Sequence, residues 1–277
     1  MTFDPFADFA ERGYLRNHFG EKDHDIIRRA EHSAFVSGIE EAFSNLSQRP
    51  FLSYADVLGT HKALFKDIYP WAGQDRFQTT PDIAVSKGDI LFAHPEAAQQ
   101  AVEYALRLGH DKTFMSQHPG DVMGYLAYGH PFLDGNGRTI MVVHSELAQR
   151  AGISIDWAET DKMQYLSALT NELNNPNKGI LDSYLRPFLR PAVGVDQLAS
   201  HVAKTKGLDG GADSEGDDNK ILGKVTDPAL QARYKEQERQ RTTDSNPMYQ
   251  TYREQAAAQL EPEPTATQQE HKQTIKR

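Results

Sequence analysis

Apolar residues recur at helical spacing through the first 195 residues of the chain. Between Asp25 and Leu46 the positions of one predicted apolar face are Ile26, Ala30, Ala34, Ile39 and Phe43. Residues spaced three or four apart lie on one side of an α-helix. The same pattern predicts helices over residues 25–46, 54–67, 95–108, 119–128, 137–151, 159–173 and 179–189.

One short stretch has the pattern of strands instead. Between Asp82 and Phe92, two apolar runs flank the pair Lys87-Gly88. A turn-forming pair between two such runs is typical of a β-hairpin. The sequence therefore predicts an all-α domain with one small β-hairpin.

Composition changes near residue 195. Residues 207–218 read GLDGGADSEGDD, and glycine mixed with acidic residues is typical of a flexible linker. The segment 261–277 has too few apolar residues to offset the entropy lost on ordering. We therefore divide the chain into a domain of residues 1–195 and a mostly disordered polar tail of residues 196–277.

One part of this tail has helix signals. Residues 227–241 read DPALQARYKEQERQR, with Asp227 as a capping residue and Pro228 at the first helical position. We expect a short polar helix there.

Charge and composition narrow the range of partners. The net charge is −9 and the pI is about 5.7, which disfavours binding to nucleic acid. No apolar run approaches the roughly 18 residues that a membrane span needs. The N-terminal residues are mixed and acidic, unlike a secretory leader, and the chain has no cysteine. These features fit a cytoplasmic protein that binds neither nucleic acid nor membranes; secretion into a host cell stays open but is not indicated.

Residues 130–138, HPFLDGNGR, lie between two predicted helices and contain a proline and two glycines. Pro131 biases His130 away from helical geometry. Gly135 and Gly137 permit dihedral angles and close approaches that other residues disfavour. A helix that begins at such a turn directs several free N–H groups, and the positive end of its dipole, toward one point. This arrangement predicts a phosphate site.

The polar side chains of the same segment fit that prediction. Arg138 opposes the helix dipole unless a phosphate neutralises it, and Asp134 would repel phosphates unless Mg²⁺ bridges them. Asn136 can donate a hydrogen bond to a phosphate oxygen. His130 has an ordinary pKa of roughly 6.5 and can accept a proton near neutral pH. Together these groups predict a phosphoryl- or nucleotidyl-transfer site.

Two other kinds of site fit less well. A zinc site formed by His130, Asp134 and His144 lacks a fourth ligand and a familiar spacing. The sequence GxxxxGK[ST] does not occur, so the chain is not a P-loop nucleotidase.

The motif HPFLDGNGR resembles the active-site motif of the Fic family, whose members transfer AMP from ATP onto a protein hydroxyl. The resemblance extends to residues 61–74, to Gly13-Tyr14-Leu15-Arg16-Asn17 at the entry to the domain, and to residues 86–92. The resemblance spans residues 10–190. The chain is similar to bacterial members of the family, some of which act as toxins.

This resemblance implies a role for each motif residue. His130 is expected to deprotonate a Ser, Thr or Tyr hydroxyl of the target protein, which then attacks the α-phosphate of ATP. Asp134 is expected to hold Mg²⁺ between the phosphates, and Arg138 to bind the diphosphate part of the nucleotide. The anion hole is expected to consist of Gly135, Asn136 and Gly137.

The hairpin corresponds to the segment that the family calls the flap, Val85 to Phe92. It is expected to hold a target segment by strand addition through main-chain hydrogen bonds. The expected docking residues are Val85, Ser86, Lys87, Gly88 and Phe92. Such enzymes can also have a separately encoded inhibitor protein as a partner.

One position departs from the family pattern. The motif continues GNGRxxR, and the second arginine is replaced by Met141, which offers packing but no charge. Three hypotheses therefore stand: transfer of AMP from ATP, the same transfer from UTP, GTP or CDP-choline, and a catalytically weak binding module. Kinase-like relatives carry lysine at the position of Gly137, so the glycine disfavours that activity.

A second feature of the family, an inhibitory glutamate in a [ST]xxxE[GN] helix, is also incomplete. The nearest match is Ser37 to Glu41, but Ala42 follows it, so we interpret this segment as an ordinary helix face.

Overall fold

The computed structural model describes residues 16–87, 90–205 and 220–242 of the 277-residue chain. The predicted linker at residues 207–218, the segment 261–277 and the flap residue Gly88 lie outside the described residues.

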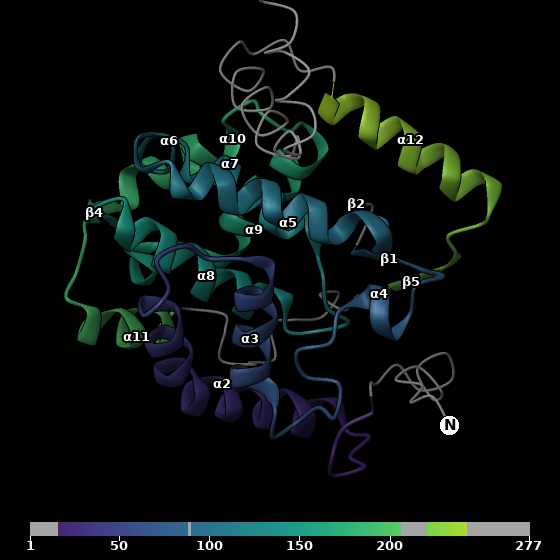
Figure 1. Cartoon of the computed structure of the whole chain (residues 1–277), viewed down its shortest axis with the longest axis horizontal. Helices are drawn as coiled ribbons and strands as arrows, with labels where there is room; N and C mark the ends of the chain where they lie inside the picture. The colour runs from purple at the N-terminus through teal and green to yellow at the C-terminus, as the bar shows by residue number, and fades with distance from the viewer. Residues whose placement is uncertain (1–15, 88–89, 206–219, 243–277) are drawn as a thin grey trace, which may run out of the picture.

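Packed α-helices form the body of the molecule, and five of them surround its centre (Figure 1). They are α2 (His24–Ser47), α3 (Tyr54–Phe65), α5 (Pro95–His110), α7 (Pro119–Gly129) and α8 (Asn136–Arg150). The helices predicted at these five places are confirmed. Helices α7 and α8 are buried along most of their length, whereas α2 and α5 expose polar residues. The loop that joins α7 to α8 therefore emerges from the centre of the molecule.

Two predicted helices are divided in the structure. The predicted helix 159–173 is a 3-10 turn, Trp157–Glu159, followed by α9 (Lys162–Asn174). The side chain of Asp161 accepts a hydrogen bond from the backbone N–H of Gln164, so α9 begins with its own cap.

The predicted helix 179–189 is likewise shorter. It contains α10 (Ile180–Leu185), a 3-10 turn (Arg186–Phe188) and the start of strand β4 (Leu189–Pro191). Pro187 lacks an N–H and cannot continue an α-helix, which explains why α10 ends before it. Two further short helices, α4 (Arg76–Thr79) and α6 (Lys112–Gln117), complete the domain.

The predicted hairpin is confirmed. Strand β1 (Ile83–Lys87) pairs antiparallel with β2 (Ile90–Leu91), with Ser86 opposite Leu91. A separate two-stranded sheet pairs β3 (Ile153–Ile155) with β4 and was not predicted, because strands of three residues carry too little pattern.

Three elements lie in the stretch assigned to the tail or extend into it, and of these only the helix at residues 227–241 was predicted. They are α11 (Val195–Ala203), β5 (Lys220–Lys224) and α12 (Pro228–Thr242). The first buries Leu198 and Val202, and β5 pairs with β1 to give a sheet of order β2-β1-β5. Such pairing satisfies backbone groups in a way that composition does not reveal.

The short helix predicted at residues 227–241 is confirmed by α12. The carboxylate of Asp227 accepts hydrogen bonds from the N–H groups of Ala229 and Leu230, as its predicted capping role requires. The division of the chain at residue 195 stays a prediction.

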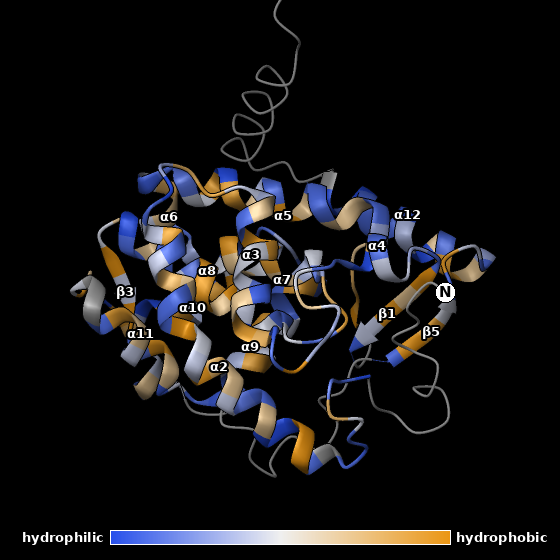
Figure 2. Cartoon of the chain, turned by 60° about the horizontal axis from the view of Figure 1, so that its bottom comes forward, coloured by the Kyte–Doolittle hydropathy of each residue, from blue (hydrophilic) through white to orange (hydrophobic). Residues whose placement is uncertain are grey.

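One large hydrophobic core holds the helices together. Side chains from α2, α3, α5, α7 and α8 contribute to it, and Trp71 and Trp157 are buried in it. Figure 2 shows the apolar residues concentrated where α3, α7 and α8 meet, with polar residues on the outside. Among the described residues, no helix combines the length and apolar character needed to cross a bilayer.

Candidate active site

The HPFLDGNGR segment is the connection between α7 and α8, and two left-handed residues shape it. His130 ends α7 with φ 40° and ψ 57°, and Gly135 precedes α8 with φ 73°. A Cβ atom on Gly135 would lie 2.5 Å from the Cε2 atom of Phe65. Both the backbone angle and the contact with Phe65 therefore require glycine at this position.

The side chain of Asn136 forms hydrogen bonds with the backbone of the same connection. Its Oδ1 accepts a hydrogen bond from the backbone N–H of Phe132 at 2.9 Å, and its Nδ2 donates to the Phe132 carbonyl at 2.7 Å. The side chain is 4% exposed. The amide of Asn136 therefore shapes the loop, and its contact with a phosphate oxygen stays a prediction.

His61 on α3 packs against the loop, and the sequence alone did not indicate this contact. Its ring is fully buried and stacks on Phe132 at 3.8 Å. The Nδ1 atom accepts a hydrogen bond from Gly73 N–H, so Nε2 carries the proton and donates to the Asp134 carbonyl at 3.0 Å. Burial lowers the pKa of His61 to about 3, so the ring is neutral at physiological pH.

Arg76 also contacts the loop, and nothing in the sequence indicated this role. The fully buried guanidinium donates from Nε to the His130 carbonyl at 2.7 Å and from Nη2 to the Ala93 carbonyl at 2.8 Å. The backbone N–H of Arg76 also donates to the Pro131 carbonyl at 2.7 Å. Burial lowers the pKa of Arg76 to about 10, so it stays charged near neutral pH. In the sequence this arginine stands among polar neighbours, and no local signal indicates its burial.

The imidazole of His130 packs against the hairpin. Its ring is parallel to that of Phe92, with centroids 3.5 Å apart and an interplanar angle of 6°. The N–H of Phe92 in turn donates to the Val85 carbonyl at 3.2 Å. Of the predicted docking residues, Val85, Ser86 and Phe92 have buried side chains, so only their backbone can serve in docking. Phe92 thus orients the histidine.

The N-terminus of α8 has the properties of an anion site. Gly135 offers no capping side chain, so the first N–H groups of the helix are not capped in that way. Gly137 is exposed, and a Cβ atom there would meet nothing within 4 Å. Asp134 is partly buried beside this helix end. A phosphate group has room to approach the backbone at Gly137.

Arg138 has a protein partner that the sequence did not reveal. Its Nη2 lies 2.8 Å from Oε2 of Glu31 on α2, and the other oxygen of Glu31 accepts a hydrogen bond from the Tyr69 hydroxyl at 2.5 Å. Burial alone would lower the pKa of Arg138, but the charges of Glu31 and Asp134 raise it above its ordinary value. Glu31 already balances the charge for which the sequence argument required a phosphate.

Two further sequence interpretations can be compared with the structure. Met141, at the place of the family's second arginine, is 4% exposed and belongs to the hydrophobic core. Glu41 pairs with Lys66 at 2.6 Å, and both side chains are about half exposed, as on an ordinary helix face. Glu31, rather than Glu41, is the glutamate of α2 that contacts the motif.

His144, the third residue of the alternative zinc site, forms a hydrogen bond with the start of α7. Its Nε2 donates to the Pro119 carbonyl at 2.7 Å, and burial lowers its pKa to about 4. This bond holds α8 against the beginning of α7.

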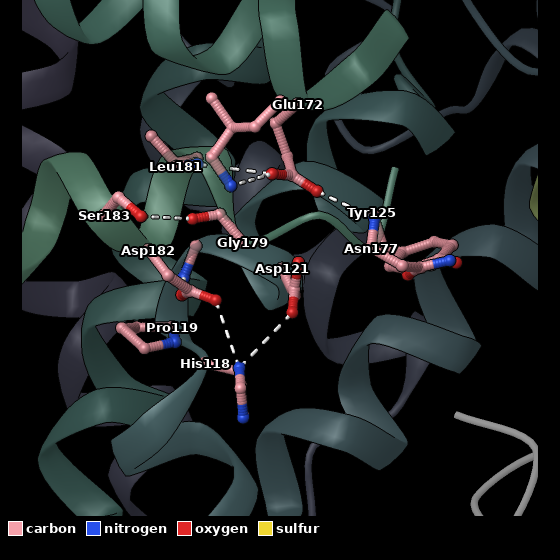
Figure 3. Close-up of polar contacts among 12 residues, drawn as sticks. His118, Pro119, Asp121, Tyr125, Glu172, Asn177, Gly179, Leu181, Asp182 and Ser183 are labelled. Carbon is pink, nitrogen blue, oxygen red and sulfur yellow. Dashed lines mark hydrogen bonds and ion pairs between the residues drawn. The ribbon is translucent and has the colours of Figure 1, made fainter. Parts of the chain in front are cut away.

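A second group of ionisable side chains lies where α7 and α10 begin (Figure 3). Nδ1 of His118 is 3.2 Å from Asp182 and 3.6 Å from Asp121, and atoms of these three residues lie close enough together to hold a metal ion. The structure also gives two of the nearby carboxylates helix-capping partners. Asp182 accepts the N–H of Gly120 at 2.6 Å, and Glu172 accepts those of Ile180 and Leu181. The group therefore stabilises two helix ends.

Comparison with known proteins agrees with this geometry. Residues 51–148 match the model of the Fic/DOC family. The chain contains a Fic/DOC family domain. The matched region includes His61, Arg76 and the whole HPFLDGNGR segment.

Two relatives carry names that state an activity. The chain is 32% identical over 174 residues to protein adenylyltransferase VbhT of Bartonella schoenbuchensis, a match that covers 60% of this chain and 35% of VbhT. It is 27% identical over 164 residues to the probable protein adenylyltransferase y4lH of Sinorhizobium fredii, with 56% and 81% covered. The chain thus spans about a third of the length of VbhT.

Solved structures of Fic domains share the fold. The N-terminal Fic domain of Bep8 from Bartonella sp. 1-1C superposes with a TM-score of 0.55 at 16% identity, covering 67% of this chain and 94% of that domain. BepC from Bartonella tribocorum, solved with bound AMPPNP, superposes with a TM-score of 0.52 at 20% identity, covering 65% and 93%.

Proposed function

We propose that this protein transfers AMP from ATP to a Ser, Thr or Tyr hydroxyl of a target protein. The observation that supports the proposal is the α7–α8 connection. In it, His130 stands five residues before Gly135, the glycine that precedes α8. The names of VbhT and y4lH support the same activity.

In the proposed reaction the target hydroxyl oxygen forms a bond to the α-phosphorus of ATP. The bond from that phosphorus to the oxygen bridging to the β-phosphate breaks, and pyrophosphate leaves. His130 accepts the hydroxyl proton. The N–H groups at Gly137 and the first turn of α8 stabilise the charge on the phosphoryl oxygens. Few reacting residues are needed, because alignment and charge stabilisation supply most of the rate enhancement.

The residues present fit a magnesium ion. Mg²⁺ in nucleotide sites is held by one or two carboxylates together with substrate phosphates. Asp134 supplies one such carboxylate, partly buried and next to the N-terminus of α8. When bound there, the ion would neutralise phosphate charge.

A second candidate function differs only in the donor. Met141 is buried in the hydrophobic core, so no positive charge stands at the place of the family's second arginine. UTP and GTP carry the same triphosphate as ATP, so of the three alternative donors only CDP-choline, which has no γ-phosphate, would depend less on that charge. Calorimetric titration of the four donors in the presence of Mg²⁺ tests this, and a clear preference for a non-adenine donor would replace the first candidate.

The proposed activity is tested with ATP labelled at the α-phosphate. With Mg²⁺ and a bacterial lysate as the source of acceptors, the wild-type protein should label a protein band, and His130→Ala should abolish the label. His201→Ala, at an exposed histidine of α11, serves as the matched control and should label normally. Label that enters only from the γ-phosphate, or nucleotide that fails to bind, would overturn the proposal, the latter in favour of a binding module.

A further inference from the structure

The residues 220–242, here called the C-terminal strap, cover the hairpin on which a target is expected to dock (Figures 1 and 2). Strand β5 runs antiparallel to β1, with Lys220 opposite Ser86, Ile221 opposite Val85 and Gly223 opposite Ala84. Beyond the strand, the N–H of Val225 donates to the Asp82 carbonyl at 2.9 Å. The outer edge of β1 is therefore occupied by the chain itself.

The strap and the hairpin share a small apolar core of their own. It consists of Ala84, Leu91, Val225 and Leu230, with Tyr234 packed against it. This cluster is separate from the large core of the helical domain. The apolar contacts between the strap and the hairpin therefore lie outside the main core.

Helix α12 adds two polar anchors. Nε2 of Gln237 donates to the Leu91 carbonyl of β2 at 2.7 Å. Arg241 stacks its guanidinium 3.5 Å from the ring centroid of Tyr128 on α7 and donates to the Leu173 carbonyl at 2.9 Å. Both anchors lie on the helix face that carries Leu230 and Tyr234, and the opposite face is exposed and polar.

These contacts bear on the proposed function, on which this inference rests. Docking by strand addition requires a free strand edge on the hairpin. The edge of β1 is paired with β5, and the Leu91 carbonyl of β2 accepts a hydrogen bond from Gln237. We propose that the strap is a built-in competitor of the target: an extended segment of the target protein replaces β5 on β1, and transfer to that target requires the strap to leave.

The pairing of β5 also indicates the chemistry of the target segment. Ile221, opposite Val85, and Gly223, opposite Ala84, are partly buried, whereas Lys220, Leu222 and Lys224 are exposed. A segment that replaces β5 should therefore be extended, with an apolar residue opposite Val85. Because the strap belongs to the same chain, it competes at an effective concentration on the order of millimolar. A free peptide can therefore bind to β1 only in a variant in which the contacts of the strap are weakened.

A reversible disulfide tests the competition. The chain has no cysteine, and Ile83 lies opposite Lys224 in the β1–β5 register, so the engineered bond is the only disulfide that Ile83→Cys/Lys224→Cys can form within one molecule. We expect AMP incorporation into lysate proteins to fall about tenfold or more when this variant is oxidised and to recover on reduction. Each single cysteine variant should show no dependence on the reductant. Equal incorporation in the oxidised and reduced forms would overturn the inference.

A peptide-binding measurement tests the docking edge without catalysis. Gln237→Ala/Arg241→Ala removes the two anchors, and Gln231→Ala/Lys235→Ala, on the exposed face of α12, is the matched control. The probe is a fluorescent peptide of residues 219–226, NKILGKVT, with a scrambled peptide beside it. It should bind the anchor variant, bind the control more weakly, and not bind the oxidised disulfide variant.

The two measurements separate the two proposals. If no variant incorporates AMP, the proposed function fails, and the peptide measurement alone decides whether β5 is displaceable. If the peptide binds the anchor variant no better than the oxidised variant, the strap is a fixed part of the fold and the inference is wrong.

Discussion

Glu31 on α2 and Arg138 in the first turn of α8 form an ion pair of 2.8 Å across 107 residues of sequence. Both side chains are largely buried, with 6% and 14% of their surface exposed. A carboxylate thus contacts the guanidinium that the family resemblance assigns to the diphosphate of the nucleotide. In the proposed site, nucleotide and Glu31 would therefore compete for Arg138.

Replacing Glu31 should therefore have two opposite effects. In Glu31→Ala the guanidinium is available to phosphate, so calorimetry should show tighter ATP binding. The free energy of unfolding should fall by about 3–5 kcal/mol, because a buried charge loses its partner. Glu41→Ala, which breaks the exposed pair with Lys66, should change stability by only about 0–1 kcal/mol and leave ATP affinity unaltered. Weaker ATP binding by Glu31→Ala would contradict the competition.

Gly135→Ala should disrupt the loop. The new methyl group would meet the Phe65 ring at 2.5 Å in a backbone conformation with φ 73°, so we expect a loss of about 2 kcal/mol or more and no detectable AMP transfer. Gly152→Ala separates the two causes, since φ there is 84° but nothing lies within 4 Å. Thermal denaturation should show a smaller loss for this control. Equal losses would mean that the contact with Phe65 contributes nothing.

Arg76→Lys should reduce transfer without removing a charge. Lysine lacks the fork that reaches the carbonyls of His130 and Ala93, so the loop should lose hydrogen bonds worth roughly 1.5–3 kcal/mol each. We expect a lower kcat in the labelling assay and a lower Tm. Arg233→Lys, on the exposed face of α12, is the control and should retain both. An unchanged kcat would show that Arg76 serves only stability.

The carboxylates near α7 and α10 should make stability depend on pH. Burial, followed by the charge of Asp121, raises the pKa of Glu172 to about 7, and burial raises the pKa of Asp182 to about 6. The folded state binds more protons at these two carboxyl groups than the unfolded state does, so their contribution to the free energy of unfolding should be lost as pH rises through about 6 to 7. The buried His61 and His144, whose pKa values are lowered, act in the opposite direction as pH rises through their ordinary value of roughly 6.5, so the carboxyl contribution is measured as a difference between the wild-type protein and a variant.

Urea denaturation at several pH values checks this dependence. Asp121→Asn removes a charge that raises the pKa of Glu172, so its stability should fall less between pH 6.5 and 8 than that of the wild-type protein. An equal or steeper fall would show that another group titrates in that range.

The sequence by itself determined the helices with strong periodicity, the hairpin and the place of the HPFLDGNGR loop between two helices. Apolar spacing, capping residues and glycine positions act within one or two turns of chain, so they can be recognised without a structure. The same local signals placed the ends of α12, and they failed where Pro187 and Asp161 divided predicted helices.

Only the tertiary structure decided what surrounds that loop. Glu31, His61 and Arg76 contact it from other elements, and β5 reaches β1 across more than a hundred residues. Their roles depend on which faces meet after folding, and a single buried arginine or a five-residue strand carries no such information in its neighbours. Burial and long-range pairing are properties of the packed chain, so they appear only when the elements are assembled.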